Sequence, residues 1–144
     1  MASTRSDADR VLNTGISLAL DKLVQQGEFY PFGVVLTREG EIAVLTAQEC
    51  RSRPNSEAFV GALRDALCNG ARSGSYKAAA IVADFAFERP RSSGERDAIR
   101  VALESDTGEA VTCYLPYTLV MPGGTRDVRP GRPFAQRSEP TIFS

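Results

Sequence analysis

The residue types that most often carry out chemistry are sparse in this chain. It has no histidine among its 144 residues, which excludes Ser-His-Asp and Cys-His catalysis and every imidazole metal site. An enzyme built from this sequence would depend on carboxylates, lysine, tyrosine, a thiolate or a borrowed cofactor. No recognisable motif groups these side chains. The sequence therefore predicts no catalytic residue, no metal site and no cofactor, and a protein that is not an enzyme.

One triplet, Asp106-Thr107-Gly108, has the letters of the aspartic-protease motif. In those enzymes the aspartate follows an apolar strand and shares a proton with a second copy. Here the triplet lies between Ser105 and Glu109, a polar setting that is typical of a hairpin turn. We predict a turn.

Arg126, Arg129 and Arg132 recur every three residues in a segment rich in proline and glycine. In a polyproline-like segment this spacing would place them on one side, where they could contact an acidic partner or a phosphate. A solvated tail is the simpler interpretation. No glycine-rich phosphate loop and no calcium-loop spacing of carboxylates accompanies them.

Asp84 is the most informative acidic residue, because it interrupts the longest apolar run, residues 78–87. If Ile81, Ala83, Phe85 and Phe87 face the core, Asp84 lies on the opposite face with Ala80, Val82 and Ala86. That second face is too apolar to remain in water, so a helix, the tail or a second copy of the chain should cover it. A carboxylate there needs a partner, and Arg100 on the next strand is the candidate. We expect a structural pair, with a functional acid as the alternative.

The surrounding elements follow from hydrophobic periodicity. Residues 6–26 and about 56–69 have the spacing of amphipathic helices. Residues 29–48 alternate as a hairpin with a turn at Gly40, and residues 77–120 form three further strands in a meander. The order helix-strand-strand-helix-strand-strand-strand predicts an α+β fold with a mainly antiparallel five-stranded sheet. We expect one domain over residues 1–120 and an extended Pro/Gly-rich C-terminal tail over residues 121–144.

An aromatic cluster, Phe29-Tyr30-Pro31-Phe32, precedes the first strand. The simpler interpretation is a plug at the edge of the core, and the alternative is a docking surface. The complete set of residues that we predict for a possible interaction surface is Phe29, Tyr30, Phe32, Val82, Asp84, Phe85 and Arg100.

The totals restrict the class of protein. Hydrophobic residues make up 42% and charged residues 24%, and the net charge is −1 from 17 basic and 18 acidic residues, so nucleic acid is an unlikely partner. Three cysteines without CxxC spacing argue against disulfides and thiolate metal sites. There is no signal-peptide pattern, and no apolar run approaches the ~20 residues of a membrane helix. We expect a cytoplasmic protein that does not contact a membrane.

Three segments, Phe29-Tyr30-Pro31-Phe32, residues 97–101 and Leu115-Pro116-Tyr117, resemble a group of small bacterial proteins of unknown function. That resemblance implies no activity and no site residues. Separately, the element order resembles that of roadblock and profilin-like domains, which are non-enzymatic platforms that often dimerise.

The sequence therefore favours a non-enzymatic interaction or scaffold domain that associates with itself or with another protein. A module that binds a small molecule or nucleic acid is the alternative, and an inhibitor or immunity-type protein is a further one.

Overall fold

The computed structural model of the chain describes residues 5–46, 56–87 and 94–143. The elements follow in the order α1 (Arg5–Gln26), β1 (Phe32–Thr37), β2 (Ile42–Thr46), α2 (Ser56–Arg72), β3 (Tyr76–Ala86), β4 (Asp97–Ser105), β5 (Ala110–Val120), the short 3-10 helix η1 (Pro122–Gly124), β6 (Asp127–Pro130) and β7 (Phe134–Arg137).

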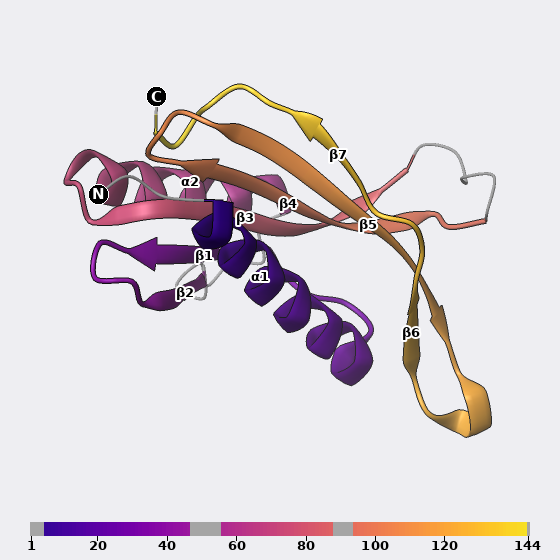
Figure 1. Cartoon of the computed structure of the whole chain (residues 1–144). Helices are drawn as coiled ribbons and strands as arrows, with labels where there is room; N and C mark the ends of the chain where they lie inside the picture. Colours follow the sequence, from indigo (N-terminus) through magenta and orange to yellow (C-terminus); the bar gives the residue numbers. More distant parts are fainter. Residues whose placement is uncertain (1–4, 47–55, 88–93, 144) are drawn as a thin grey trace.

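The strands form one curled sheet in the order β2-β1-β3-β4-β5-β6, and β7 also pairs with β5 (Figure 1). Every pairing recorded for these strands is antiparallel. The α+β class, the β1–β2 hairpin and the β3–β4–β5 meander are therefore confirmed. Gly40 and Gly108 both have a φ of +90° in the turns after β1 and β4, a conformation that glycine adopts without strain.

The segment predicted as an extended tail begins with η1, and two parts of it belong to the sheet, which therefore has seven strands rather than the predicted five. Residues Tyr117–Val120 of β5 pair with β6, and residues Val111–Tyr114 of the same strand pair with β7. Pro116 lies between these two partners. Its carbonyl accepts a 2.6 Å hydrogen bond from the Gly131 amide. In a strand, the N and C=O groups of one residue point to the same side. The nitrogen of Pro116 therefore points to the side of β5 that pairs with β6 and β7, at a position where neither β6 nor β7 needs a hydrogen-bond donor.

The two helices cover opposite faces of the sheet (Figure 1). On β3, even-numbered residues such as Ala80 and Val82 pack in the cluster with α1, whereas Ala79 and Ile81 pack in the cluster with α2. A strand that is apolar on both faces is thus buried on both faces, as in the middle layer of a three-layer domain.

The second face of β3, which the sequence left without a cover, is closed by α1. At Gly15 an added Cβ would lie 2.8 Å from Val82 Cγ2, so the helix backbone rests almost directly on that side chain. Val82 has no exposed surface. The prediction that Val82 contributes to an interaction surface is therefore wrong, because the chain's own first helix occupies the position.

The C-terminal residues return to the α2 face. Ile142 is 3% exposed and packs in the same cluster as Leu63, Leu67 and Ile81. The end of the segment predicted as a tail is therefore held on the domain by Ile142. Neither helix in the described part of the chain combines the length and apolar character needed to cross a membrane.

Candidate functional site

Asp84 lies near the end of β3 on the face that carries α1, and its partner is Tyr117 of β5. The tyrosine hydroxyl donates a 2.7 Å hydrogen bond to Asp84 Oδ1. The strand register explains the contact, because Asp84 is level with Ile99 of β4, which is level with Leu115, two residues before Tyr117. Tyr117 is only 3% exposed. The carboxylate therefore satisfies a buried hydroxyl that would otherwise be costly.

The predicted pair between Asp84 and Arg100 is wrong. Arg100 is level with Ala83, so its side chain leaves the sheet on the opposite face. Its guanidinium carbon lies 5.4 Å from the centroid of the Phe85 ring, a cation–π distance. Arg100 consequently belongs to a different surface from Asp84.

A recess of about 270 Å³ opens beside the Asp84 carboxylate and is lined by Gln26, Glu28, Phe29, Tyr30, Asp84, Phe85, Ala86 and Asp97. Partial burial in this recess raises the pKa of Asp84, and the nearby negative charges of Asp97 and Glu28 raise it further, while the hydrogen bond from Tyr117 acts in the opposite direction.

Tyr117 remains the neutral donor of the pair. Burial raises the pKa of its phenol far above the usual range, and the hydrogen bond to Asp84 and the charge of that carboxylate act in the same direction. A phenol held in its protonated form is suited to a structural hydrogen bond rather than to proton abstraction. Within the described residues, no group of three or more histidine, cysteine, aspartate or glutamate side chains could hold a metal ion.

The predicted docking surface at residues 29–32 is mostly closed. Phe29 and Phe32 are 8% and 1% exposed, and their rings meet edge to face with centroids 5.9 Å apart. The plug interpretation is thus correct for these two rings. Tyr30 differs, because it is 60% exposed and lies at the mouth of the recess beside Asp84.

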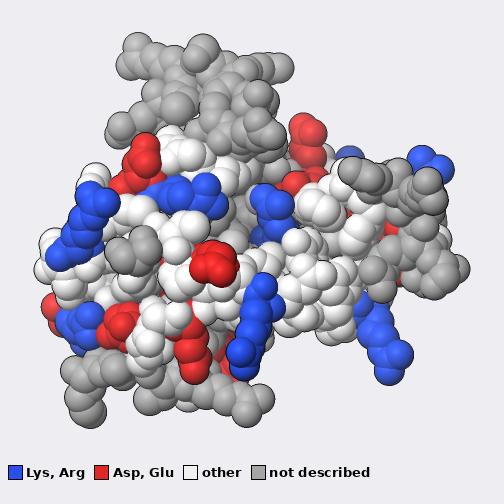
Figure 2. All heavy atoms as spheres, turned by 90° about the horizontal axis from the view of Figure 1, so that it is seen from above, with Lys and Arg blue, Asp and Glu red and all other residues white. Residues whose placement is uncertain are grey.

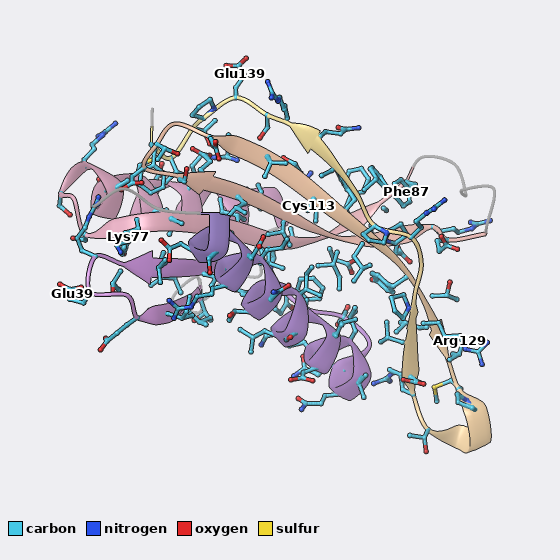
Figure 3. The ribbon with its side chains drawn as sticks, in the orientation of Figure 1. Glu39, Lys77, Phe87, Cys113, Arg129 and Glu139 are labelled. Carbon is cyan, nitrogen blue, oxygen red and sulfur yellow. The ribbon has the colours of Figure 1, made fainter. Side chains whose placement is uncertain are left out.

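Four aromatic rings gather on the α2 face of the sheet, at the end of β3. We call Phe85, Phe87, Tyr114 and Phe134 the aromatic surface. Tyr114 and Phe134 stack with centroids 4.9 Å apart, Phe85 meets Tyr114 at 5.3 Å and Phe87 at 5.4 Å, and Phe87 lies 6.4 Å from Phe134. All four rings are partly exposed, and none belongs to the buried clusters under α1 and α2. Figure 3 labels Phe87 at this end of the sheet.

The sequence identified Phe85 of this surface and the neighbouring Arg100 but not the other three rings. Phe87 follows the same alternation as Phe85, and this signal pointed to the correct face. Tyr114 and Phe134 required the register between β4, β5 and β7, which no local pattern specifies.

A second apolar feature lies on the other face, between α1 and the outer strands. This apolar groove has a volume of about 360 Å³ and is lined by Leu12, Ile16, Ile99, Val101, Cys113, Tyr114, Leu115, Pro133, Phe134 and Ala135. Cys113 of β5 lies above α1 (Figure 3). Burial raises the pKa of its thiol, so the thiol stays neutral and the groove lining carries no charge.

The remaining motifs are structural. Asp106 begins the β4–β5 turn and accepts a 2.8 Å hydrogen bond from Arg38 Nη1, while the Gly108 amide closes the turn onto the Ser105 carbonyl at 3.1 Å. The turn interpretation of Asp106-Thr107-Gly108 is therefore confirmed.

The structure also changes the interpretation of the repeated arginines, Arg126, Arg129 and Arg132. Arg129 lies in β6 (Figure 3), whereas Arg126 and Arg132 lie outside this strand, so the three arginines do not belong to one polyproline-like segment. Basic and acidic side chains are interspersed on the face shown in Figure 2. Among the described residues on that face there is no single-sign area of the kind that binds a phosphate backbone.

No protein-family model, no curated protein and no solved structure matches the chain.

Proposed function

We propose that this chain is a non-catalytic protein-binding domain and that its partner lies on the aromatic surface, over Phe85, Phe87, Tyr114 and Phe134. The observation that carries the proposal is the gathering of four partly exposed rings, with an arginine beside them, outside both helix-covered cores.

The composition of this surface is that of an interface centre. Aromatic residues and arginine are enriched at the centres of protein interfaces and dominate binding energy, because they bury large areas with few rotatable bonds. Phe85, Tyr114 and Phe134 also lie on β-strands, whose backbone is already ordered, so little conformational entropy is lost when a partner docks.

The positive charge of Arg100 beside the rings favours a partner that carries a negatively charged group. Arg100 reaches the edge of the surface over Phe85 and offers planar donors that suit a carboxylate. The partner we propose is thus another protein whose contact surface has an apolar centre and a carboxylate facing Arg100. The thiols of Cys68 and Cys113 are free, which is compatible with the reducing cytoplasm.

The test is site-directed photo-cross-linking in the source cells, with benzoylphenylalanine in place of Phe134. The control carries the same group at Val44, which is 43% exposed on β2, the strand at the opposite edge of the sheet. We expect one protein to be captured at position 134 and not at position 44. The captured protein is then purified and titrated against wild type, Tyr114→Ser and Arg100→Gln, which should each weaken binding about tenfold or more.

Two results would contradict the proposal. Equal capture at positions 44 and 134 would show that the rings are not a specific surface. Capture of nothing but a second copy of the chain, together with a dimer in light scattering, would replace the acidic partner with self-association.

The apolar groove favours a second candidate function, the binding of a small uncharged molecule. Its volume lies within the range of small-molecule sites, and a lining without charges suits an apolar ligand. Titration with an uncharged naphthalene dye should show saturable fluorescence that Cys113→Phe, which fills the groove, abolishes. Unsaturable fluorescence, or equal binding by both chains, would exclude this function.

A further inference from the structure

The last residues of the chain sit in a groove in the manner of a bound peptide. We call residues 141–143 the C-terminal arm, and the surface beneath it, formed by α2, β1, β3 and Glu104 of β4, the arm groove. Glu104 is only 5% exposed, and a buried carboxylate requires donors. Each hydrogen bond recorded for its side chain comes from the arm.

These hydrogen bonds bind the arm mainly through its backbone amides. Glu104 Oε1 accepts from the amides of Thr141 at 2.9 Å, Ile142 at 2.7 Å and Phe143 at 3.2 Å, and Glu104 Oε2 accepts from the Thr141 hydroxyl at 3.0 Å. Three consecutive amides on one carboxylate fix the position of the segment without depending on most of its side chains.

Two side chains supply the specificity, the Thr141 hydroxyl on Glu104 and the buried Ile142. Ile142 is buried in the cluster that contains Leu63 and Leu67 of α2. The Cys68 thiol donates to the Thr141 carbonyl at 3.2 Å, so α2 also contacts the arm backbone. The arm groove thus recognises a short extended segment with a hydroxyl followed by a branched aliphatic residue.

The connection between β7 and the arm is short. Ser138 is held by its amide on the Ala110 carbonyl at 3.1 Å, Glu139 is exposed, and Pro140 follows. A proline disfavours helical or folded-back conformations of the residue before it, so the connection is biased toward extension away from β7. Short hinges of this kind are where identical elements are exchanged between copies, because the contacts in the second copy are the same.

We propose that the arm groove is a peptide-binding site that accepts the C-terminal arm of a second copy of this chain, so that exchange of arms links two copies. This inference is independent of the aromatic surface and its partner, which lie on other residues. Since the contacts are identical in both arrangements, concentration and the hinge determine which one is populated.

The test uses two full-length populations that report exchange through a disulfide. The first retains Cys68 and carries Cys50→Ser and Cys113→Ser. The second carries Thr141→Cys together with serine at all three native cysteine positions. Neither population can close the bond between positions 68 and 141 within one chain, so a mixed disulfide requires the arm of one copy in the groove of the other.

After mixing, equilibration and mild oxidation, we expect a mixed dimer whose yield rises with total protein concentration. The control is a second population that also carries Ile142→Asp, whose charged arm cannot enter the arm groove. We expect its mixed-dimer yield to be lower by about tenfold. Wild type should show a concentration-dependent dimer in light scattering.

A single chain with both Cys68 and Thr141→Cys shows whether the bond can form at all. If this chain closes its internal disulfide, while the mixed dimer never exceeds the Ile142→Asp background at any concentration, the arm stays within its own chain and the proposal is overturned. That result would leave the proposed function at the aromatic surface untouched, because no residue of that surface is changed.

Discussion

Asp84 and Tyr117 are joined across β4 by a hydrogen bond of 2.7 Å, which the phenol donates and the carboxylate accepts. The acceptor lies at the edge of a recess that also holds Asp97 and Glu28. The bond pairs the buried hydroxyl of Tyr117, but the carboxylate that accepts it lies near the negative charges of Asp97 and Glu28. These two effects have opposite signs for stability, and different substitutions separate them.

Asp84→Asn and Asp84→Ala should have opposite consequences at pH 7. The asparagine retains an acceptor for Tyr117 and removes the repulsion, so the free energy of unfolding should rise by less than about 1 kcal/mol. The alanine leaves a buried hydroxyl unpaired, which should cost about 1–3 kcal/mol. Urea denaturation measures both values. In a Tyr117→Phe background the alanine penalty should vanish, and equal stability of the two single variants would show that the bond contributes nothing.

The pH dependence of the same pair has a defined sign. Because the pKa of Asp84 is raised above 3.8 in the folded chain, the folded state holds this proton more tightly than the unfolded state. The contribution of Asp84 to the free energy of unfolding is therefore fully present below pH 3.8, and it is lost as the pH rises through the pKa of the folded state. The stability advantage of Asp84→Asn should therefore grow as the pH increases from 3 to 7. An advantage that shrinks over this range would contradict the assignment.

Gly15→Ala should destabilise the chain, although alanine is the better helix former. The added methyl would lie 2.8 Å from Val82 Cγ2, and Val82 is buried and stiff about its χ1 angle. Overpacking costs about 1–3 kcal/mol, against a gain in helix propensity of up to about 1 kcal/mol. Gly61→Ala in α2 is the matched control, because nothing lies within 4 Å of its added Cβ. Thermal denaturation should rank Gly61→Ala above wild type and Gly15→Ala below it.

Arg38→Lys should weaken the junction of three turns. Arg38 donates through Nη1 to Asp106 at 2.8 Å, through Nε to the Gly74 carbonyl at 3.1 Å and through Nη2 to the Tyr76 carbonyl at 3.1 Å. A lysine ammonium lacks the fork that reaches these acceptors together. Because the site is partly exposed, we expect a loss of about 1 kcal/mol. Asp106→Asn keeps an acceptor and should cost less, and the reverse order in thermal denaturation would contradict this account.

Periodicity predicted the parts of the fold whose signals are local. Ile99, Val101 and Leu103 alternate in the sequence and are all buried on one face of β4. Residues of β3 are apolar on both faces, and this predicted correctly that both faces are covered. Periodicity could not predict which helix covers which face. Both helices are amphipathic, and neither sequence indicates the face of the sheet on which the helix packs.

Register was the main source of error. Pairing Asp84 with Arg100 instead of placing Ala83 opposite Arg100 is a shift of one residue, which moves a side chain to the other face of the sheet. The β3–β4 connection includes residues 88–93, which lie outside the described residues, and its length alone does not fix the register. The same uncertainty hid the contact between Tyr114 and Phe134.

The short strands β6 and β7 show the limit of local reasoning in a different way. Each has four residues, and β6 contains Pro130, so neither carries an alternating pattern long enough to read. They are strands because the eleven residues of β5 offer an open edge on which to pair. Their strand conformation thus comes from tertiary context rather than from propensity.

The placement of α1 beneath the sheet has a consequence for the order of folding. Its apolar face packs on β1 but also on β3 and β4, which occur much later in the chain, and the Arg126 side chain reaches the Val24 carbonyl across 102 residues of sequence. Most of the stability of a helix in a folded protein comes from the packing of its apolar face rather than from its own propensity. A helix that precedes all of these strands in the chain is therefore fully stabilised only after they have paired, and the rate of folding should be limited by distant strand pairing rather than by helix formation.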